Sequence, residues 1–133
     1  MNKRLLMICS AIAMLVLASI ACEASVTTAN ISSATMVADP STGEETTVYS
    51  PDQTFYCVVV LANAPDDTKV KAVWYQVDDS GETTQFAEKE IVGSGSPITF
   101  NASNANGWPA GNYRVEIYLN DKVDKTLDFS VEE

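Results

Sequence analysis

The fold of this chain is decided by its last long stretch, WPAGNYRVEIYLNDKVDKTLDFSV, which spans residues 108–131. Apolar and polar residues alternate within it on both sides of a polar centre at Asn120 and Asp121. Because successive side chains of a strand point to opposite faces, the pattern predicts two antiparallel strands with one apolar wall. Two strands alone are marginally stable, so we expect the preceding residues to supply an opposing sheet. The alternating apolar residues are Tyr113, Val115, Ile117 and Leu119 on the first strand, and Leu127, Phe129 and Val131 on the second.

The turn between these strands must place both apolar sets on one face. A regular two-residue turn at Asn120 and Asp121 puts Leu119 opposite Lys122, and this register sends the two sets to opposite faces. We therefore predict either a three-residue loop or a two-residue turn followed by a bulge. The three-residue loop pairs Leu119 with Val123, Val115 with Leu127, and Tyr113 with Phe129.

The first residues have the pattern of an export signal. A basic segment, residues 1–4, precedes an apolar and small-residue run that ends at Ala21. This arrangement is typical of a secretory signal peptide, and the run falls short of the roughly 20 residues of a membrane-spanning helix. The sequence SIAC at residues 19–22 resembles a bacterial lipobox, with Ser19 where Leu is usual. We expect Cys22 to be lipidated; the alternative is ordinary signal-peptidase cleavage after Ala21 or Ala24.

These patterns divide the chain into three parts. Residues 1–21 are the expected signal peptide, residues 22–29 a flexible tether, and residues 30–133 one folded domain. Lys3 and Arg4 leave with the signal, so the 8 basic residues fall to 6 against 18 acidic ones, a net charge of −12. A field of this sign repels nucleic acid and anionic headgroups, which excludes nucleic-acid binding.

The middle of the chain consists of short apolar segments separated by turns. No long segment has helical periodicity, and clusters of Gly, Pro, Asn and Asp recur at strand-plus-loop spacing. Residues 55–61 are apolar on both faces, which is typical of a central or partly covered strand. The sequence therefore predicts an all-β, two-sheet antiparallel sandwich of about seven or eight strands. The strands expected before the final hairpin are 30–38, 46–49, 55–61, 69–78, 84–92 and 98–100.

Three residues are spaced as in an immunoglobulin-like domain. Cys57, Trp74 and Tyr113 resemble the B-strand Cys, the C-strand Trp and the F-strand Tyr of that family. Val115 stands where the family has its second disulfide Cys. In lacking that Cys, the chain resembles fibronectin type III-like and many bacterial Ig-like domains. The resemblance implies a Tyr113 hydroxyl bonded back to the backbone, and sheets joined by packing without a disulfide. It implies an architecture rather than an activity, because this fold hosts many functions. The expected core residues are Cys57, Trp74, Tyr113, Val115 and Phe129.

The residue types that catalysis and metal binding need are scarce. The chain has no histidine, which removes Ser/His and Cys/His nucleophilic sites, the commonest general base and most transition-metal sites. Cys57 lies in an apolar run without basic neighbours, so we interpret it as a core residue and not as a reactive thiol. Acidic pairs such as Asp66–Asp67 and Asp78–Asp79 lie in predicted turns, where a solvated loop is favoured over calcium binding. We expect no enzymatic activity, no cofactor and no metal.

Aromatic residues are the remaining candidates for a contact site. Trp108 lies in a loop rich in Gly, Asn and Pro, while Tyr75 and Tyr118 point away from the predicted core. Exposed rings of this kind stack on sugars or anchor protein partners. The alternative interpretation is that Trp108 caps the sandwich and the tyrosines pack with cross-strand neighbours.

Our hypothesis is a non-enzymatic, lipid-anchored, extracytoplasmic Ig-like module with a binding or structural role in the bacterial cell envelope. One alternative is an accessory or inhibitor-type subunit that docks on an envelope protein, and another is a carbohydrate-binding module that uses exposed aromatics. The expected partners are an unidentified protein or glycan, together with the membrane through lipid on Cys22. Without that lipid, the protein is expected to be secreted or periplasmic.

Overall fold

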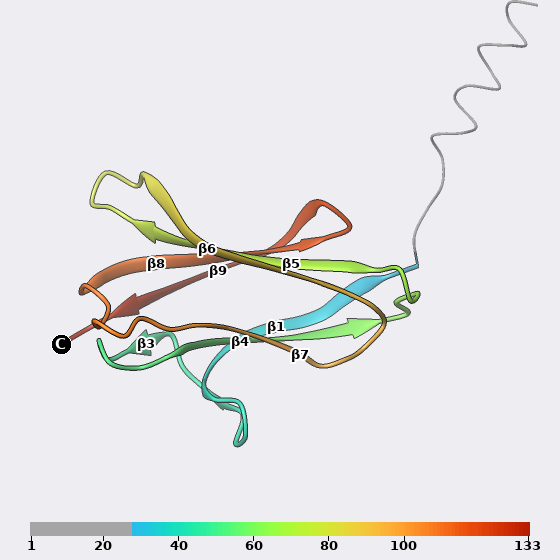
Figure 1. Ribbon diagram of the computed structural model, residues 1–133, viewed down its shortest axis with the longest axis horizontal. Coiled ribbons are helices and arrows are strands. Elements are labelled where there is room, and N and C mark those ends of the chain that lie inside the picture. Colours follow the sequence, from blue (N-terminus) through green and yellow to red (C-terminus); the bar gives the residue numbers. More distant parts are fainter. Residues whose placement is uncertain (1–27) are drawn as a thin grey trace, which may run out of the picture.

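The computed structural model describes residues 28–133, and these residues form two β-sheets packed face to face (Figure 1). The strands are β1 (Asn30–Asp39), β2 (Glu44–Glu45), β3 (Val48–Tyr49), β4 (Phe55–Ala62), β5 (Lys69–Val77), β6 (Thr83–Val92), β7 (Ile98–Ala102), β8 (Gly111–Leu119) and β9 (Lys122–Val131). One sheet has the order β2-β1-β4-β7, and the other has the order β3-β9-β8-β5-β6. The predicted all-β sandwich is confirmed.

Two details of the sandwich differ from the prediction. The described residues contain nine strands, because the short segment Glu44–Glu45 pairs with β1 as a strand of its own. The sheets are also not purely antiparallel, since β3 runs parallel to β9 with Val48 opposite Ser130. A hairpin joins only antiparallel neighbours, and β3 instead reaches β9 by crossing over from the other sheet.

The β8–β9 hairpin has the second of the two predicted geometries. Asn120 and Asp121 both have left-handed backbones, with φ of 47° and 69°, as a two-residue type I′ turn requires. Leu119 therefore faces Lys122, and the three-residue loop that paired Leu119 with Val123 is wrong. The physical reason is that Asn and Asp tolerate the left-handed region better than other non-glycine residues.

A bulge next to this turn restores the common apolar face. The ladder between β8 and β9 shifts by one residue shortly before the turn. Beyond the shift, Val115 faces Leu127 and Tyr113 faces Phe129, as predicted. The two-residue turn followed by a bulge is thus confirmed, and it keeps the apolar side chains of both strands on the inner face.

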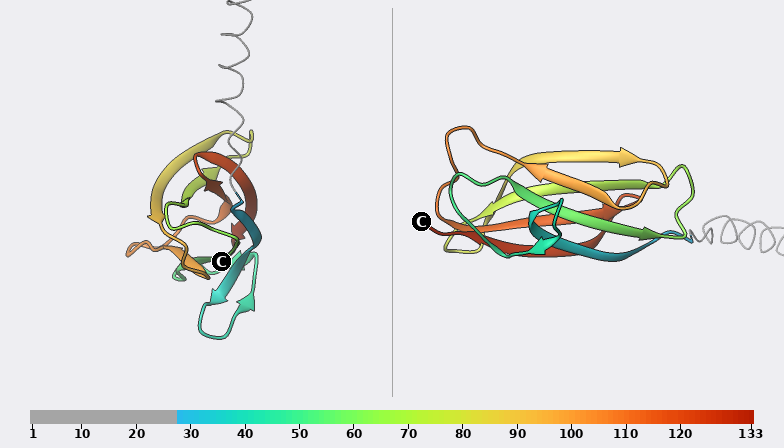
Figure 2. Two further views of the ribbon diagram at one scale, coloured as in Figure 1. Left: turned by 90° about the vertical axis from the view of Figure 1, so that its right-hand side faces the viewer. Right: turned by 90° about the horizontal axis from the view of Figure 1, so that it is seen from below.

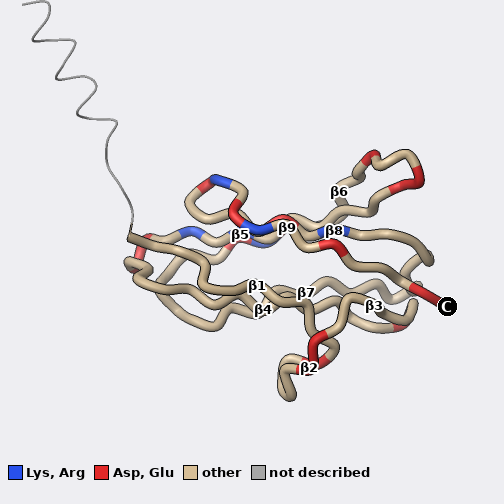
Figure 3. Tube along the Cα trace, turned by 180° about the vertical axis from the view of Figure 1, so that it is seen from behind, with Lys and Arg blue, Asp and Glu red and all other residues tan. Residues whose placement is uncertain are grey.

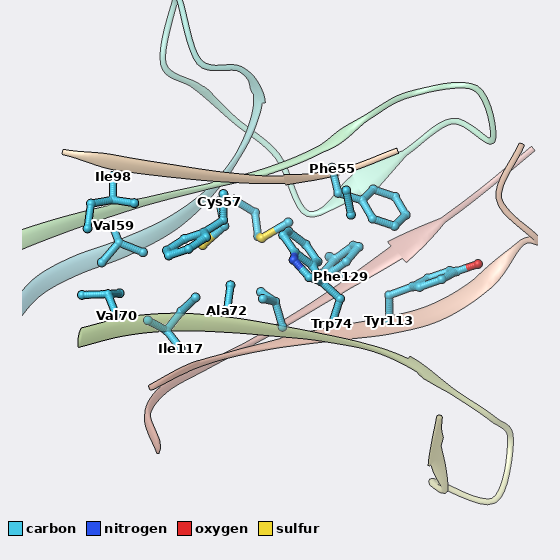
Figure 4. Close-up of a cluster of buried hydrophobic side chains, with 14 of the residues drawn as sticks. Phe55, Cys57, Val59, Val70, Ala72, Trp74, Ile98, Tyr113, Ile117 and Phe129 are labelled. Atoms are coloured by element: carbon cyan, nitrogen blue, oxygen red, sulfur yellow. The ribbon is translucent and has the colours of Figure 1, made fainter. Parts of the chain in front are cut away.

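The core lies between the sheets and is dominated by aromatic rings (Figure 4). Phe55 of β4 is fully buried. Its ring centroid lies 4.4–6.2 Å from those of five other aromatic residues. Trp74, Tyr113 and Phe129 among them belong to the five-stranded sheet, so Phe55 connects the two sheets. The expected core residues Cys57, Trp74, Tyr113, Val115 and Phe129 are each at most 4% exposed.

The start of β8 has the backbone contact that the resemblance implied. The Tyr113 hydroxyl donates a 2.6 Å hydrogen bond to the carbonyl oxygen of Pro109. Gly111 lies between them with a φ of 145°, a conformation that residues with a Cβ rarely adopt. The chain therefore turns sharply into β8, and the bond satisfies a partly buried hydroxyl.

Replacing Phe55 with Ala should lower the free energy of unfolding by roughly 3–5 kcal/mol, because the change removes a buried ring that contacts both sheets. Urea unfolding followed by circular dichroism measures the loss. Val92→Ala is the control: Val92 is 57% exposed. That control should change stability by less than about 0.5 kcal/mol. A Phe55→Ala loss below about 1.5 kcal/mol would contradict the central place of this ring.

Candidate binding surface

The outer face of the five-stranded sheet carries a cluster of side chains that we name the tyrosine face. β5 contributes Lys71, Val73 and Tyr75, and β8 contributes Glu116 and Tyr118. In the register of the two strands, Lys71 lies opposite Tyr118 and Val73 lies opposite Glu116. Since the residues that alternate with them are the buried core residues of both strands, all five share the face that points away from the core.

The polar side chains of the tyrosine face contact one another. The Nζ atom of Lys71 lies 4.6 Å from the ring centre of Tyr118, a cation–π geometry. The Tyr118 hydroxyl donates a 3.4 Å hydrogen bond to Oε2 of Glu116. Burial raises the pKa of Tyr75 to about 12, and interactions with Glu116 and Tyr118 add to the shift. Tyr75 therefore stays protonated at neutral pH and serves as a hydrogen-bonding group, not as a base.

Val73 shows how closely these side chains cover the sheet. It points out of the sandwich, yet it is only 3% exposed. Tyr75 and Tyr118 are themselves half-buried. Beside them, Arg114 and Asp128 form a 2.7 Å ion pair at the edge of a cavity of about 220 Å³. The surface thus combines an apolar base with tyrosine and arginine, the residue types that are enriched in protein interfaces.

Trp108, the third predicted contact residue, does not form an exposed site. Its side chain is 9% exposed, with Phe55 stacked at 4.4 Å and Phe86 at 5.1 Å between ring centroids. The indole N–H donates a 2.9 Å hydrogen bond to the carbonyl of Gln53, and the backbone N–H donates one of 2.8 Å to that of Pro51. These bonds tie the loop over Phe55. The interpretation of Trp108 as a sugar- or partner-stacking ring is therefore corrected, because the residue caps one end of the sandwich.

The cysteines fall into two groups. Cys22 lies outside the described residues, as do the expected signal peptide and residues 22–27 of the tether, so lipidation stays a prediction. Cys57 is the free cysteine of residues 28–133, and it is fully buried. Burial raises its pKa to about 12. The nucleophile of cysteine chemistry is the thiolate, so Cys57 is inert at neutral pH.

The acidic turn at residues 78–82 has a structural explanation. The Asp78 carboxylate accepts hydrogen bonds from the backbone N–H groups of Ser80 and Glu82, each at 2.9 Å, and from the Ser80 hydroxyl at 2.6 Å. These bonds, led by the Ser80 hydroxyl, lower the pKa of the Asp78 carboxyl. Asp78 therefore closes its own turn. In the part of the chain that the structure describes, no group of three or more His, Cys, Asp or Glu side chains is arranged to hold a metal ion.

Comparison of the chain with protein-family models and with curated proteins gave no match. Within residues 28–133, no helix is long and apolar enough to cross a membrane.

Sequence reasoning found the two tyrosines of the tyrosine face and missed its two charged residues, Lys71 and Glu116. Alternation placed Tyr75 and Tyr118 on an outer face, and the structure brings them together around Glu116. Lys71 and Glu116 have the same parity as the tyrosines on their own strands, so alternation also indicated their direction. The missing information was the β5–β8 register, which places Lys71 against Tyr118, 47 residues further along the chain.

The stability of the protein should decline between pH 9 and pH 12, in part because of Cys57, whose pKa rises from 9.0 to about 12 in the folded state. The protonated thiol favours the folded state fully below pH 9, and this contribution is lost as the pH rises through the window. Cys57→Ala removes the titrating group and should therefore show a flatter decline. Urea titrations of both proteins across this range measure the two slopes, and equal slopes would show that the thiol does not contribute.

Proposed function

We propose that this chain is a non-enzymatic, lipid-anchored, extracytoplasmic Ig-like module of the bacterial cell envelope that binds a partner protein through its tyrosine face. The observation that carries the proposal is the mutual packing of Tyr75, Tyr118 and Glu116 around the covered Val73. Tyrosine supplies a large contact area and a hydrogen-bonding tip at a low cost in conformational entropy. Side chains that are already ordered before binding lose still less entropy when a partner docks.

The position of the N-terminal strand supports attachment of the domain by one end. β1 begins at one end of the long axis, and the C-terminus lies at the opposite end (Figure 2). The Thr28 hydroxyl donates a 3.0 Å hydrogen bond to the carbonyl of Asn63, which fixes this part of the chain beside the β4–β5 loop. Lipid on Cys22 would hold this end toward the membrane and leave the tyrosine face, on the side of the sandwich, open to a partner.

The distribution of charge along this axis supports the same orientation (Figure 3). The end where β1 begins carries charges of both signs. Lys69 is paired there with Asp121 of the β8–β9 turn at 3.7 Å, while Asp66 and Asp67 lie in the β4–β5 loop. The opposite end carries acidic residues of the β5–β6 turn and the C-terminus. Since anionic headgroups repel carboxylates, an anchored domain is favoured with its acidic end away from the membrane. The acidic residues at the far end are Asp78, Asp79, Glu82, Glu132 and Glu133.

Anchoring predicts the mass of the native protein. The chain recovered from the native membrane fraction should have the mass of residues 22–133 plus a diacylglyceryl group, because lipid is attached to the new first residue. Cys22→Ser removes the attachment point and should release the protein from that fraction. An unmodified chain that begins after Ala21 or Ala24 would contradict the anchoring part of the proposal.

Partner binding predicts site-specific crosslinking. A photoreactive phenylalanine analogue at Tyr118 should yield one stoichiometric adduct in the native envelope, because this position lies in the tyrosine face. The matched control is the same analogue at Tyr56, a half-buried tyrosine on the outer face of the four-stranded sheet. No adduct from Tyr118, or the same adducts from both positions, would rule out the tyrosine face as the contact surface.

A further inference from the structure

The side of the sandwich where β1 and β9 meet is open over much of its length. Among the described residues, β1 pairs on this side with β2, through Val37 and Asp39. β9 pairs there with β3, through Ser130 and Val131. Strands β1 and β9 also contact each other across the two sheets. Among the described residues, the segments 30–36 and 122–128 therefore form two strand edges that lie close together and have no hydrogen-bonded strand on this side.

A cavity of about 360 Å³ lies between these two edges, and we name it the edge slot. Ala34 and Met36 of β1 line one wall, and Leu127 and Asp128 of β9 line the other. The segment 45–47, where the chain crosses from one sheet to the other, closes one end. Ala34 and Leu127 are partly buried and pack against the core, so the floor of the slot is apolar.

The backbone of both strands points its hydrogen-bonding groups into this slot. The Ser130 N–H donates to the Thr47 carbonyl at 2.9 Å, and the Met36 carbonyl accepts from the Thr46 N–H at 3.1 Å. Backbone groups of residues two apart along a strand point in the same direction. Thr126 and Asp128, which precede Ser130 without an intervening bulge, therefore direct their N–H and C=O groups to the same side. These groups continue the row of outward backbone groups of β9, of which β3 pairs only the part at Ser130 and Val131.

The slot is limited in length, which favours a short segment. Lys125 pairs with the buried core residue Ile117 of β8. Since directly paired residues share a face of the sheet, Lys125 lies on the inner side of β9. Its Nζ atom is 3.5 Å from a carboxylate oxygen of Asp124. An inward-pointing charge on an edge strand limits uncontrolled strand addition. The accessible part of the edge thus lies between Lys125 and the crossing segment.

The rim of the slot is negatively charged. Glu45 lines it, Glu44 is its neighbour, and both are exposed. No ion pair within residues 28–133 includes either of them, whereas Asp128 is paired with Arg114 at 2.7 Å. A second copy of this chain would bring the same acidic rim and is disfavoured by like-charge repulsion. A segment with a basic residue beside Glu45 is favoured instead.

We propose that the edge slot binds an extended segment of a partner protein, which adds to β9 as a short strand in line with β3. Its backbone pairs with Thr126 and Asp128, one apolar side chain sits on Ala34 and Leu127, and a flanking Lys or Arg lies beside Glu45. Strand addition of this kind derives its affinity from backbone hydrogen bonds and its specificity from the pockets for alternate side chains. The inference does not depend on the tyrosine face or on the lipid.

The test uses a defined probe, the fluorescent peptide Lys-Val-Thr-Val-Thr-Val-Lys, and fluorescence anisotropy with the purified protein. The expected result is one-to-one binding, and weaker binding of a peptide with Glu in place of both Lys. Thr126→Pro removes an outward N–H that the β8–β9 ladder does not use, a place where an edge strand tolerates proline. This variant should fold normally and bind the peptide about tenfold more weakly.

Charge variants make the result independent of the proline substitution. Glu45→Lys, on an exposed hairpin, should weaken binding of the Lys-flanked peptide about threefold or more and improve binding of the Glu-flanked peptide. Glu90→Lys is the matched control, because it makes the same charge change at an exposed position of β6. This strand forms the edge of the five-stranded sheet that lies opposite β9 and the slot. The control should leave both affinities within about twofold of the original.

Four outcomes would overturn the proposal. The first two are no binding of either peptide at about millimolar concentration, and equal binding of the two peptides. The third is binding that Thr126→Pro and Glu45→Lys leave unchanged. The fourth is a dimer of the original protein that Thr126→Pro converts to a monomer. The last of these would assign the slot to a second copy of the chain.

Discussion

The packing of Phe55 against rings of the opposite sheet is the interaction on which this structure depends. Cys57, the cysteine of the described residues, is free, so no disulfide within them joins the sheets. Phe129 lies edge-on to Phe55 at 4.7 Å, and Trp74 stacks at 6.2 Å. Aromatic pairs contribute roughly 0.5–1.5 kcal/mol each beyond the burial of their area. A ring with five such neighbours therefore joins the two sheets by packing.

The same ring determines what the ends and sides of the domain present to a partner. Trp108 is held over Phe55 at 4.4 Å, which removes it from the surface. Tyr49 packs against Phe55 at 5.1 Å, and its hydroxyl donates a 2.7 Å hydrogen bond to the Val37 carbonyl on β1. Tyr49 thus joins β3 to β1 at the crossing between the sheets. The closed end of the edge slot is therefore fixed by the core.

Local patterns predicted the parts of this structure that local physics determines. Alternation identified the pairing of Val115 with Leu127, because only one register buries both. It left the turn open between two geometries, and the left-handed conformations of Asn120 and Asp121 decided between them. The sequence of its loop did not predict that Trp108 is buried, since Gln53, whose carbonyl accepts from the indole N–H, lies 55 residues away. A short strand was expected at residues 46–49, but its parallel pairing with β9 was not predicted, because a strand of two residues has no alternation that indicates its partner.

The two candidate surfaces present different chemistry, and this difference follows from their places in the sheets. The tyrosine face lies on the middle strands β5 and β8, whose backbone groups are already paired, so only side chains are available there. The edge slot lies beside an edge of each sheet, so backbone groups are available as well. Both lie along the sides of the sandwich and not at its ends. A domain held by one end can therefore present both surfaces at once, with side-chain recognition on the sheet and backbone recognition at the slot.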